Sequence, residues 1–286
     1  MPKYKAFTTK YWRPGEDYEK EIITNLKGEV SDGDFVVISE KAVSTALNNI
    51  VDESLIKPSL SAKIIAKWWM PIVWGYLLGP LCHLRRETIL RLRRYPFEMG
   101  SRHKQVALQH AGLLQALMFS SEGGVDGSNL PHSYVSLPLK NADIIARKIQ
   151  RKILSELGVK VTVLIVDTDK TFSFKGFHFT PRPKPIKGIH SFGGILTYVV
   201  GRMFKLKKRA TPIAVAGCKL TVEEALTIAD FANRVRGFGA GRTIWDMAET
   251  FKVNLTGVSW EMLEKVKHKP IVLVRKTPST HSSAVV

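Results

Sequence analysis

Short apolar runs, rich in β-branched residues, are separated by polar stretches along the chain and predict strands. Residues 35–39 (Phe-Val-Val-Ile-Ser) and 159–166 are the clearest, because a short continuous apolar run is typical of a strand buried on both faces. The second run is expected to end at Asp167. Further strands are predicted at residues 3–9, 135–139, 213–216 and 271–274.

Helical spacing of apolar residues predicts helices at residues 16–26, 40–47, 141–157 and 221–236. Gly158 is placed to end the third of these helices. Thr221 and Glu224 form a capping box at the start of the fourth. Because strands and helices do not alternate strictly, the pattern favours an α+β (mixed α/β) fold. We expect residues 1–275 to form a single unit, with two intimately packed subdomains as the alternative, and residues 276–286 to be a flexible tail.

The segment 68–82 is apolar and uncharged but is too short to span a membrane, which takes roughly 20 apolar residues. Prolines and glycines at 71, 75, 79 and 80 are expected to interrupt it. The preferred interpretation is a buried or interface segment within a mostly helical stretch from 59 to 94. A contact with one membrane leaflet is the alternative, since its tryptophans lie beside a basic run.

The chain carries 43 Lys and Arg residues against 25 Asp and Glu, a net charge of +18. A positive field of this size attracts nucleic acid, anionic membranes or phosphorylated small molecules, and charge alone does not choose among them. The two cysteines form no Cys-x-x-Cys pair, which excludes a zinc-finger or disulfide framework. The first residues contain no apolar run of signal-peptide length, so a cytoplasmic protein without a transmembrane segment is expected.

Two acidic segments are candidates for a metal and phosphate site. The loop 121–131 presents Glu122, Asp126 and Asn129 among glycines, and such oxygens can bind Mg²⁺ or Mn²⁺. Asp167 follows a rigid apolar strand, where α/β sheets often hold ligands. The alternatives are an ordinary surface turn for the loop and a solvated strand end for Asp167.

Basic and glycine-rich segments suggest anion binding of another kind. Residues 237–241 contain three glycines with arginines on either side, which is typical of a helix-ending linker and compatible with a phosphate nest. The clusters at 85–94 and 205–209 are dense in Lys and Arg, and aromatic residues lie near the first. Nucleic-acid binding is therefore an alternative, although no recognised RNA- or DNA-binding motif accompanies the clusters.

Three separated motifs resemble the coenzyme F-420-0:L-glutamate γ-ligase family, in the same order, over about residues 30–250. The matching positions are Gly33-Asp34, Lys41 and Val43-Ser44; then Gly124, Asp126, Ser128 and Asn129; then Leu137-Pro138 and Asp167-Thr168. The resemblance implies a mixed α/β γ-glutamyl ligase-like fold and an intertwined homodimer.

The resemblance also implies GTP-dependent addition of L-glutamate to an acid activated as an acyl phosphate, with Mg²⁺ or Mn²⁺ as cofactor. It assigns Asp126 and Asp167 as metal ligands and leaves the catalytic residues unassigned. Nucleotide- or substrate-binding positions by the same analogy are Lys41, Ser44, Gly124, Ser128, Asn129 and Thr168.

The chain also departs from the family pattern at phosphate-binding positions. Thr45 stands where the family has a second lysine, and Glu122-Gly123 replaces an asparagine–alanine pair. Two hypotheses therefore stay open: a ligase that acts on a phosphate-bearing acid, and a non-catalytic relative that binds a polyanion such as RNA or a nucleotide.

Overall fold

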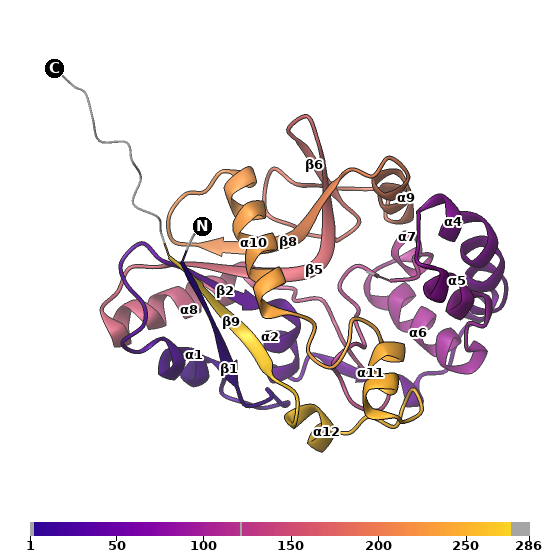
Figure 1. Ribbon diagram of the computed structural model, residues 1–286, viewed down its shortest axis with the longest axis horizontal. Helices are drawn as coiled ribbons and strands as arrows, with labels where there is room; N and C mark the ends of the chain where they lie inside the picture. The colour runs from indigo at the N-terminus through magenta and orange to yellow at the C-terminus, as the bar shows by residue number, and fades with distance from the viewer. Residues whose placement is uncertain (1–2, 121, 276–286) are drawn as a thin grey trace.

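The computed structural model describes residues 3–120 and 122–275, which form a mixed sheet covered by helices and a second, mainly helical part (Figure 1). The strands are β1 Tyr4–Thr9, β2 Phe35–Ser39, β3 Ile50–Asp52, β4 Tyr134–Ser136, β5 Thr162–Phe174, β6 Phe177–Thr180, β7 His190–Ser191, β8 Lys207–Ala216 and β9 His268–Val274. The predicted fold class is confirmed.

Four of the α-helices lie where the apolar spacing predicts them, at residues 18–26, 40–46, 142–157 and 222–236, and the structure contains further helices besides these. The α-helices are α1 Tyr18–Leu26, α2 Glu40–Ala46, α3 Leu60–Ile64, α4 Gly79–Leu81, α5 Arg86–Arg93, α6 Phe97–His110, α7 Leu113–Ala116, α8 Ala142–Leu157, α9 Ile195–Met203, α10 Val222–Arg236, α11 Ile244–Phe251 and α12 Trp260–Glu264. A 3-10 helix, η1, spans Glu53–Leu55, and a π-helix, η2, spans Ile65–Leu78. The capping box of α10 is present, and Gly158 ends α8 in the left-handed conformation.

The main sheet has the order β1-β9-β2-β5-β6-β7, with β8 on the other side of β5. β2 and β5 are parallel and in register from Phe35–Thr162 to Ser39–Val166, whereas β8 and β9 pair antiparallel with their neighbours. The last residue of β2, Ser39, pairs with Val166 of β5. The first residues of α2 therefore lie next to Asp167, which follows Val166. This register brings Glu40 and Lys41 beside Asp167.

Asp167 does not end its strand, contrary to the sequence prediction. β5 continues to Phe174, and its pairing with β8 shifts between Asp167 and Lys170. The residues in between, Thr168 and Asp169, form a bulge. The continuation was missed because Asp-Thr-Asp-Lys lacks the apolar pattern of a strand, and a bulge turns such side chains away from regular pairing.

Helices cover both faces of the sheet because alternate strand residues point to opposite sides. Val36 and Val163 belong to the core cluster with α1 and α8, while Val37 and Leu164 belong to the cluster with α10. Figure 1 shows α10 over one face and α1 with α8 away from it. The sheet is thus buried on both faces around β2 and β5, which fixes Asp167 rigidly.

The helical part comprises η2, α4, α5, α6 and α7 and packs against α9 and the far end of β5 and β6. The expected interruption at Pro71 is wrong: η2 runs through this proline as one helix. Ala66, Met70 and Trp74 are buried, whereas Ile64, Trp68 and Ile72 are exposed. The segment is therefore half-buried. Within the described ranges, no helix has the length and apolar character that a membrane crossing requires.

Candidate functional site

A cavity of about 560 Å³ lies where the two parts of the molecule meet. Its walls come from the start of α2, the bulge of β5, the loop 122–130, the end of α10 and residues of α5, α6 and α11. Six of the eight residues assigned by family resemblance line this cavity: Lys41, Asp126, Ser128, Asn129, Asp167 and Thr168. The structure thus brings together residues that are up to 127 positions apart in the sequence, Lys41 and Thr168 being the extremes.

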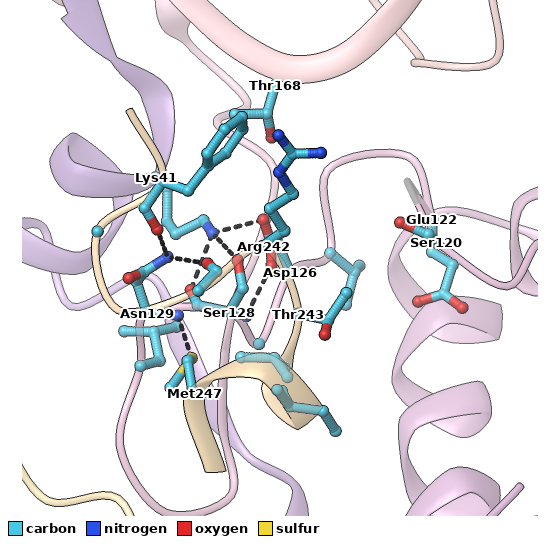
Figure 2. A pocket seen from close by; sticks show the side chains of 18 of the residues that line it. Lys41, Ser120, Glu122, Asp126, Ser128, Asn129, Thr168, Arg242, Thr243 and Met247 are labelled. Carbon is cyan, nitrogen blue, oxygen red and sulfur yellow. Dashed lines mark hydrogen bonds and ion pairs between the residues drawn. The ribbon is translucent and has the colours of Figure 1, made fainter. Parts of the chain in front are cut away.

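Lys41 and Asp126 form an ion pair at the centre of the cavity wall (Figure 2). Lys41 Nζ lies 2.5 Å from Asp126 Oδ2 and donates to Ser128 Oγ at 2.6 Å and to the Ser128 carbonyl at 2.8 Å. The Ser128 amide donates to Asp126 Oδ1 at 2.7 Å. The turn therefore presents oxygen atoms to the lysine ammonium group, which is one-fifth exposed toward the cavity.

The Asn129 side chain connects the glycine-rich segment 237–241 to the loop 122–130 by hydrogen bonds. Its side-chain amide donates to the carbonyls of Phe238 and Gly241, and its Oδ1 accepts from the Ala240 amide at 2.7 Å. A Cβ on Gly239 would lie 2.4 Å from Asn129 Oδ1, so the glycine is needed for this close approach. The segment 237–241 is thus part of the cavity wall.

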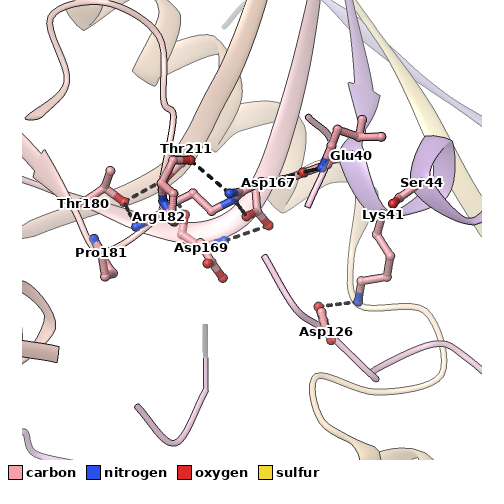
Figure 3. Close-up of polar contacts among 12 residues, drawn as sticks. Glu40, Lys41, Ser44, Asp126, Asp167, Asp169, Thr180, Pro181, Arg182 and Thr211 are labelled. Carbon is pink, nitrogen blue, oxygen red and sulfur yellow. Dashed lines mark hydrogen bonds and ion pairs between the residues drawn. The ribbon is translucent and has the colours of Figure 1, made fainter. Parts of the chain in front are cut away.

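Asp167 is held by an arginine that the sequence interpretation did not single out. Arg182 Nε donates to Asp167 Oδ2 at 2.6 Å, and another guanidinium nitrogen donates to Glu40 Oε1 at 2.5 Å (Figure 3). All three side chains are buried, and Glu40 also accepts from the Leu139 amide. Arg182 lies in the loop after β6, which carries no motif that could have revealed this pairing.

The remaining predicted positions take different places. Thr168 lines the cavity and is half-buried. Gly124 lines a small void beside the cavity and packs against Arg182. Ser44 is fully buried. Its hydroxyl donates a hydrogen bond to the Leu137 carbonyl at 2.6 Å and accepts one from the side-chain amide of Asn49. Ser44 therefore ties α2 to the segment after β4, and a contact with a nucleotide stays a prediction for this residue.

Glu122 turns away from Asp126 toward a buried charge cluster, so the loop does not present both acids to one ion. Glu122 accepts hydrogen bonds from Lys104 and pairs with His103, whose other ring nitrogen lies 2.6 Å from Glu53 Oε1. Burial lowers the pKa of His103, but attraction to Glu122 and Glu53 outweighs burial and places the pKa well above its ordinary value. The cluster thus adds an imidazolium to the cavity wall.

Cationic side chains dominate another part of the wall. Arg236 donates to Asn233 Oδ1, and the described residues offer it no ion-pair partner. Burial lowers the pKa of Arg236 to about 10, with Asp167 and Asp126 acting in the other direction, so the side chain is still charged at neutral pH. Arg242 stacks over Phe238 at 3.9 Å from the ring centre. An anionic ligand is the natural complement of this wall.

The residues present do not form a site for a resident divalent cation. Carboxylate oxygens are the right ligands for Mg²⁺ or Mn²⁺. However, Asp126 is already paired with Lys41 and Asp167 with Arg182. In the part of the chain that the structure describes, no three His, Cys, Asp or Glu side chains are grouped to hold a metal ion.

The basic clusters noted in the sequence are partly engaged in the fold. Arg91 pairs with Asp246 at 2.8 Å and with Glu249 at 2.5 Å, which joins α5 to α11. Arg209 is buried on β8 and pairs with Glu223 at 2.6 Å. Arg93 donates to the Gly75 carbonyl and lies over the Tyr76 ring. These arginines support the packing of helices and strands, whereas a free nucleic-acid surface would leave them unpaired.

Comparison with known proteins identifies a family and relatives of this chain. The F420-0:Gamma-glutamyl ligase family model matches residues 7–239. An uncharacterized protein of Methanocaldococcus jannaschii is 37% identical over 280 residues, covering 93% of this chain and 94% of its own. The coenzyme F420:L-glutamate ligase of Methanopyrus kandleri is 28% identical over 156 residues, covering 54% and 55% of the two chains.

The family match includes the β2–α2 turn, the loop 122–130, the β5 bulge and α10, all of which contribute residues to the cavity wall described above. The strands and helices that carry these segments form the mixed α/β fold that the resemblance implied. The chain belongs to the F420-0:γ-glutamyl ligase family.

Proposed function

We propose that this protein is a GTP-dependent ligase that joins L-glutamate, through a γ-linked amide product, to coenzyme F420-0 or a related phosphate-bearing acid. The observation that carries the proposal is the cavity shared by the family's motif residues and by cations that have no acidic partner, Arg236 above all. Family membership supports a ligase activity. The cationic wall supports a substrate and a nucleotide that both carry phosphate.

The proposed reaction has two steps. First, the terminal carboxylate of the acid attacks the γ-phosphorus of GTP, which forms an acyl phosphate and releases GDP. The glutamate amine then attacks the acyl carbon, the C–N bond forms as the C–O bond to phosphate breaks, and the amine proton passes to solvent or base. Arg236 and Arg242 would hold phosphate oxygens, and such electrostatic stabilisation is the main catalytic contribution in phosphoryl transfer.

The Mg²⁺ or Mn²⁺ expected from the resemblance would enter bound to the phosphates of GTP. This assignment follows from the ion pairs at Asp126 and Asp167, which neutralise the carboxylates before any substrate arrives. A homodimer is also proposed from the resemblance.

The direct test is to incubate the protein with F420-0, GTP, L-glutamate and Mg²⁺ or Mn²⁺ and to measure glutamyl addition and GDP by mass spectrometry. We expect a product that carries one added glutamyl residue, formed only with all components present. A folded protein that binds GTP but yields no product from F420-0 would overturn the proposal that F420-0 is the substrate. If the protein does not bind GTP at all, the proposed GTP-dependent ligase activity is wrong.

Arg236 provides a matched test of the cationic wall. Arg236→Gln should weaken GTP binding by about ten-fold or more, since a hydrogen bond to a charged group contributes ~1.5–3 kcal/mol. Arg151→Gln is the control, because Arg151 is exposed on α8 and is not among the residues that line the cavity. Calorimetric titration of GTP into both variants measures the difference, and equal affinities would exclude Arg236 from the site.

A second candidate is a non-catalytic relative that binds an anion. It is favoured by the same two ion pairs, which place cationic side chains on both acids that the family resemblance assigns to metal. Such a protein would bind GTP or RNA without turnover and without a requirement for divalent ions.

A further inference from the structure

The Arg182 side chain is enclosed between two acids beneath the cavity. It is 2% exposed, and its partners Glu40 and Asp167 are 4% and 9% exposed. Nε binds Asp167, one terminal nitrogen binds Glu40, and the other donates to the Pro183 carbonyl at 3.0 Å. Every guanidinium nitrogen is therefore used, and burial of this charge is offset by two anions.

The guanidinium group lies at the point where the family motifs converge. A Cβ on Gly124 would lie 2.7 Å from Arg182 Cζ, so the loop 122–130 rests directly on the guanidinium plane. Gly124 also has a φ of +94°, which favours glycine independently. Beside it is a void of about 10 Å³ lined by Glu40, Asp126 and Asp167, together with Lys41.

Glu40, Asp126 and Asp167 line this space, which is about the size of one water molecule, and each of them is already paired with a side-chain cation. Figure 3 shows two separate groups of ion pairs: Arg182 with Glu40 and Asp167, and Lys41 with Asp126. A divalent ion bound between Glu40 and Asp167 would have to displace the Arg182 guanidinium, and this group, 2% exposed, would then be buried without its acidic partners, which is costly.

We propose that Arg182 is the resident cation of this site and takes the place of a protein-bound divalent metal ion, and that Glu40 and Asp167 become a metal site only when Arg182 is removed. Loss of the guanidinium leaves two buried carboxylates facing one small space. Carboxylates arranged in this way attract Mg²⁺ or Mn²⁺ strongly. The inference does not depend on ligase activity, because it concerns the protein without nucleotide.

The test is titration of MnCl₂ into the nucleotide-free protein, followed by calorimetry and by the electron paramagnetic resonance signal of free Mn²⁺. We expect wild type to bind Mn²⁺ only weakly and Arg182→Gln to bind it at least ten-fold more tightly, with a Mn²⁺-dependent rise in Tm. Addition of Asp167→Asn to Arg182→Gln should abolish this gain. Arg209→Gln is the matched control, since Arg209 is equally buried but pairs with a largely exposed acid, Glu223.

Wild-type protein decides the question even if Arg182→Gln does not fold. Tight Mn²⁺ binding by wild type that Asp167→Asn removes would overturn the proposal, because a metal would then share the site with Arg182. Weak wild-type binding that Asp167→Asn leaves unchanged would support it. A folded Arg182→Gln variant that gains no Mn²⁺ binding would overturn the assignment of Glu40 and Asp167 as a potential metal site.

Discussion

At the scale of single residues, the fold buries paired charges beside the cavity. Lys104 is fully buried and donates to Glu122 and to the Met118 carbonyl. It lies next to Tyr95, which lines the cavity. A buried ammonium group that has lost its acid, or an acid that has lost its ammonium group, carries an uncompensated charge.

Lys104→Met should lower the free energy of unfolding by about 3–5 kcal/mol, because Glu122 would keep only its pairing with His103. Urea denaturation measures this loss. Lys207→Met is the control: Lys207 is 63% exposed, and its pair with Glu223 should contribute less than about 1 kcal/mol. The double variant Lys104→Met/Glu122→Gln should be more stable than the single variant. Equal stability of the two would contradict the ion pair as the cause.

Individual site residues could be predicted only where local motifs name them. Lys41, Asp126 and Ser128 belong to motifs and do meet in space. Arg182 could not be found from the sequence, because a single arginine in a proline-rich loop has no local signature. Its partners are 15 and 142 positions away, and only the tertiary fold brings them together.

At the scale of elements, α10 connects the sheet to the cavity. Its N-terminus carries the predicted capping box, in which Thr221 and Glu224 exchange hydrogen bonds. Its C-terminus delivers Arg236 to the cavity wall. The position of this arginine thus depends on a helix that is fixed at its other end and packed on β8 and β9.

Thr221→Ala should lower the free energy of unfolding by about 1 kcal/mol, the usual contribution of an N-cap hydroxyl. The control is Thr227→Ala on the exposed side of the same helix, where Thr227 bonds only the Glu223 carbonyl and a change within about 0.5 kcal/mol is expected. Chemical denaturation distinguishes the two. A loss in Thr227→Ala as large as that in Thr221→Ala would show that hydroxyl removal in general, and not capping, is responsible.

The π-helix η2 explains why its segment was misjudged from the sequence. Among its buried residues, Ala66, Met70 and Trp74 recur every four positions, a longer repeat than the 3.6 residues of an α-helical turn. The sequence indicated helical character for this stretch, and the expected interruption rested on its prolines and glycines, Pro71 among them. The i→i+5 hydrogen bonding of a π-helix accommodates the longer repeat.

At the scale of the whole molecule, the cavity lies between the sheet and the helical part, and no single stretch of sequence encodes it. The strands and motif loops of one wall were predictable, because apolar runs and family motifs mark them. The opposite wall from α5, α6 and α11 was not, because its cavity-lining residues are spaced by packing between helices. The net charge of +18 indicated an anionic ligand but not whether that ligand is a polymer.

Salt dependence distinguishes the two classes of ligand. GTP bound in the cavity would contact a few cations, Arg236 among them, and its affinity should fall less than about ten-fold between roughly 50 and 200 mM NaCl. A protein that binds RNA through 6–10 phosphate contacts would lose about 10³–10⁵ in affinity over the same range. Parallel titrations with GTP and a single-stranded RNA oligonucleotide measure both slopes.

Because Arg91 and Arg209 are engaged in ion pairs within the fold, we expect the shallow GTP dependence together with weak RNA binding. Tight RNA binding with the steep slope would instead favour the non-catalytic relative, with the positive charge serving a polymer that lies outside the cavity.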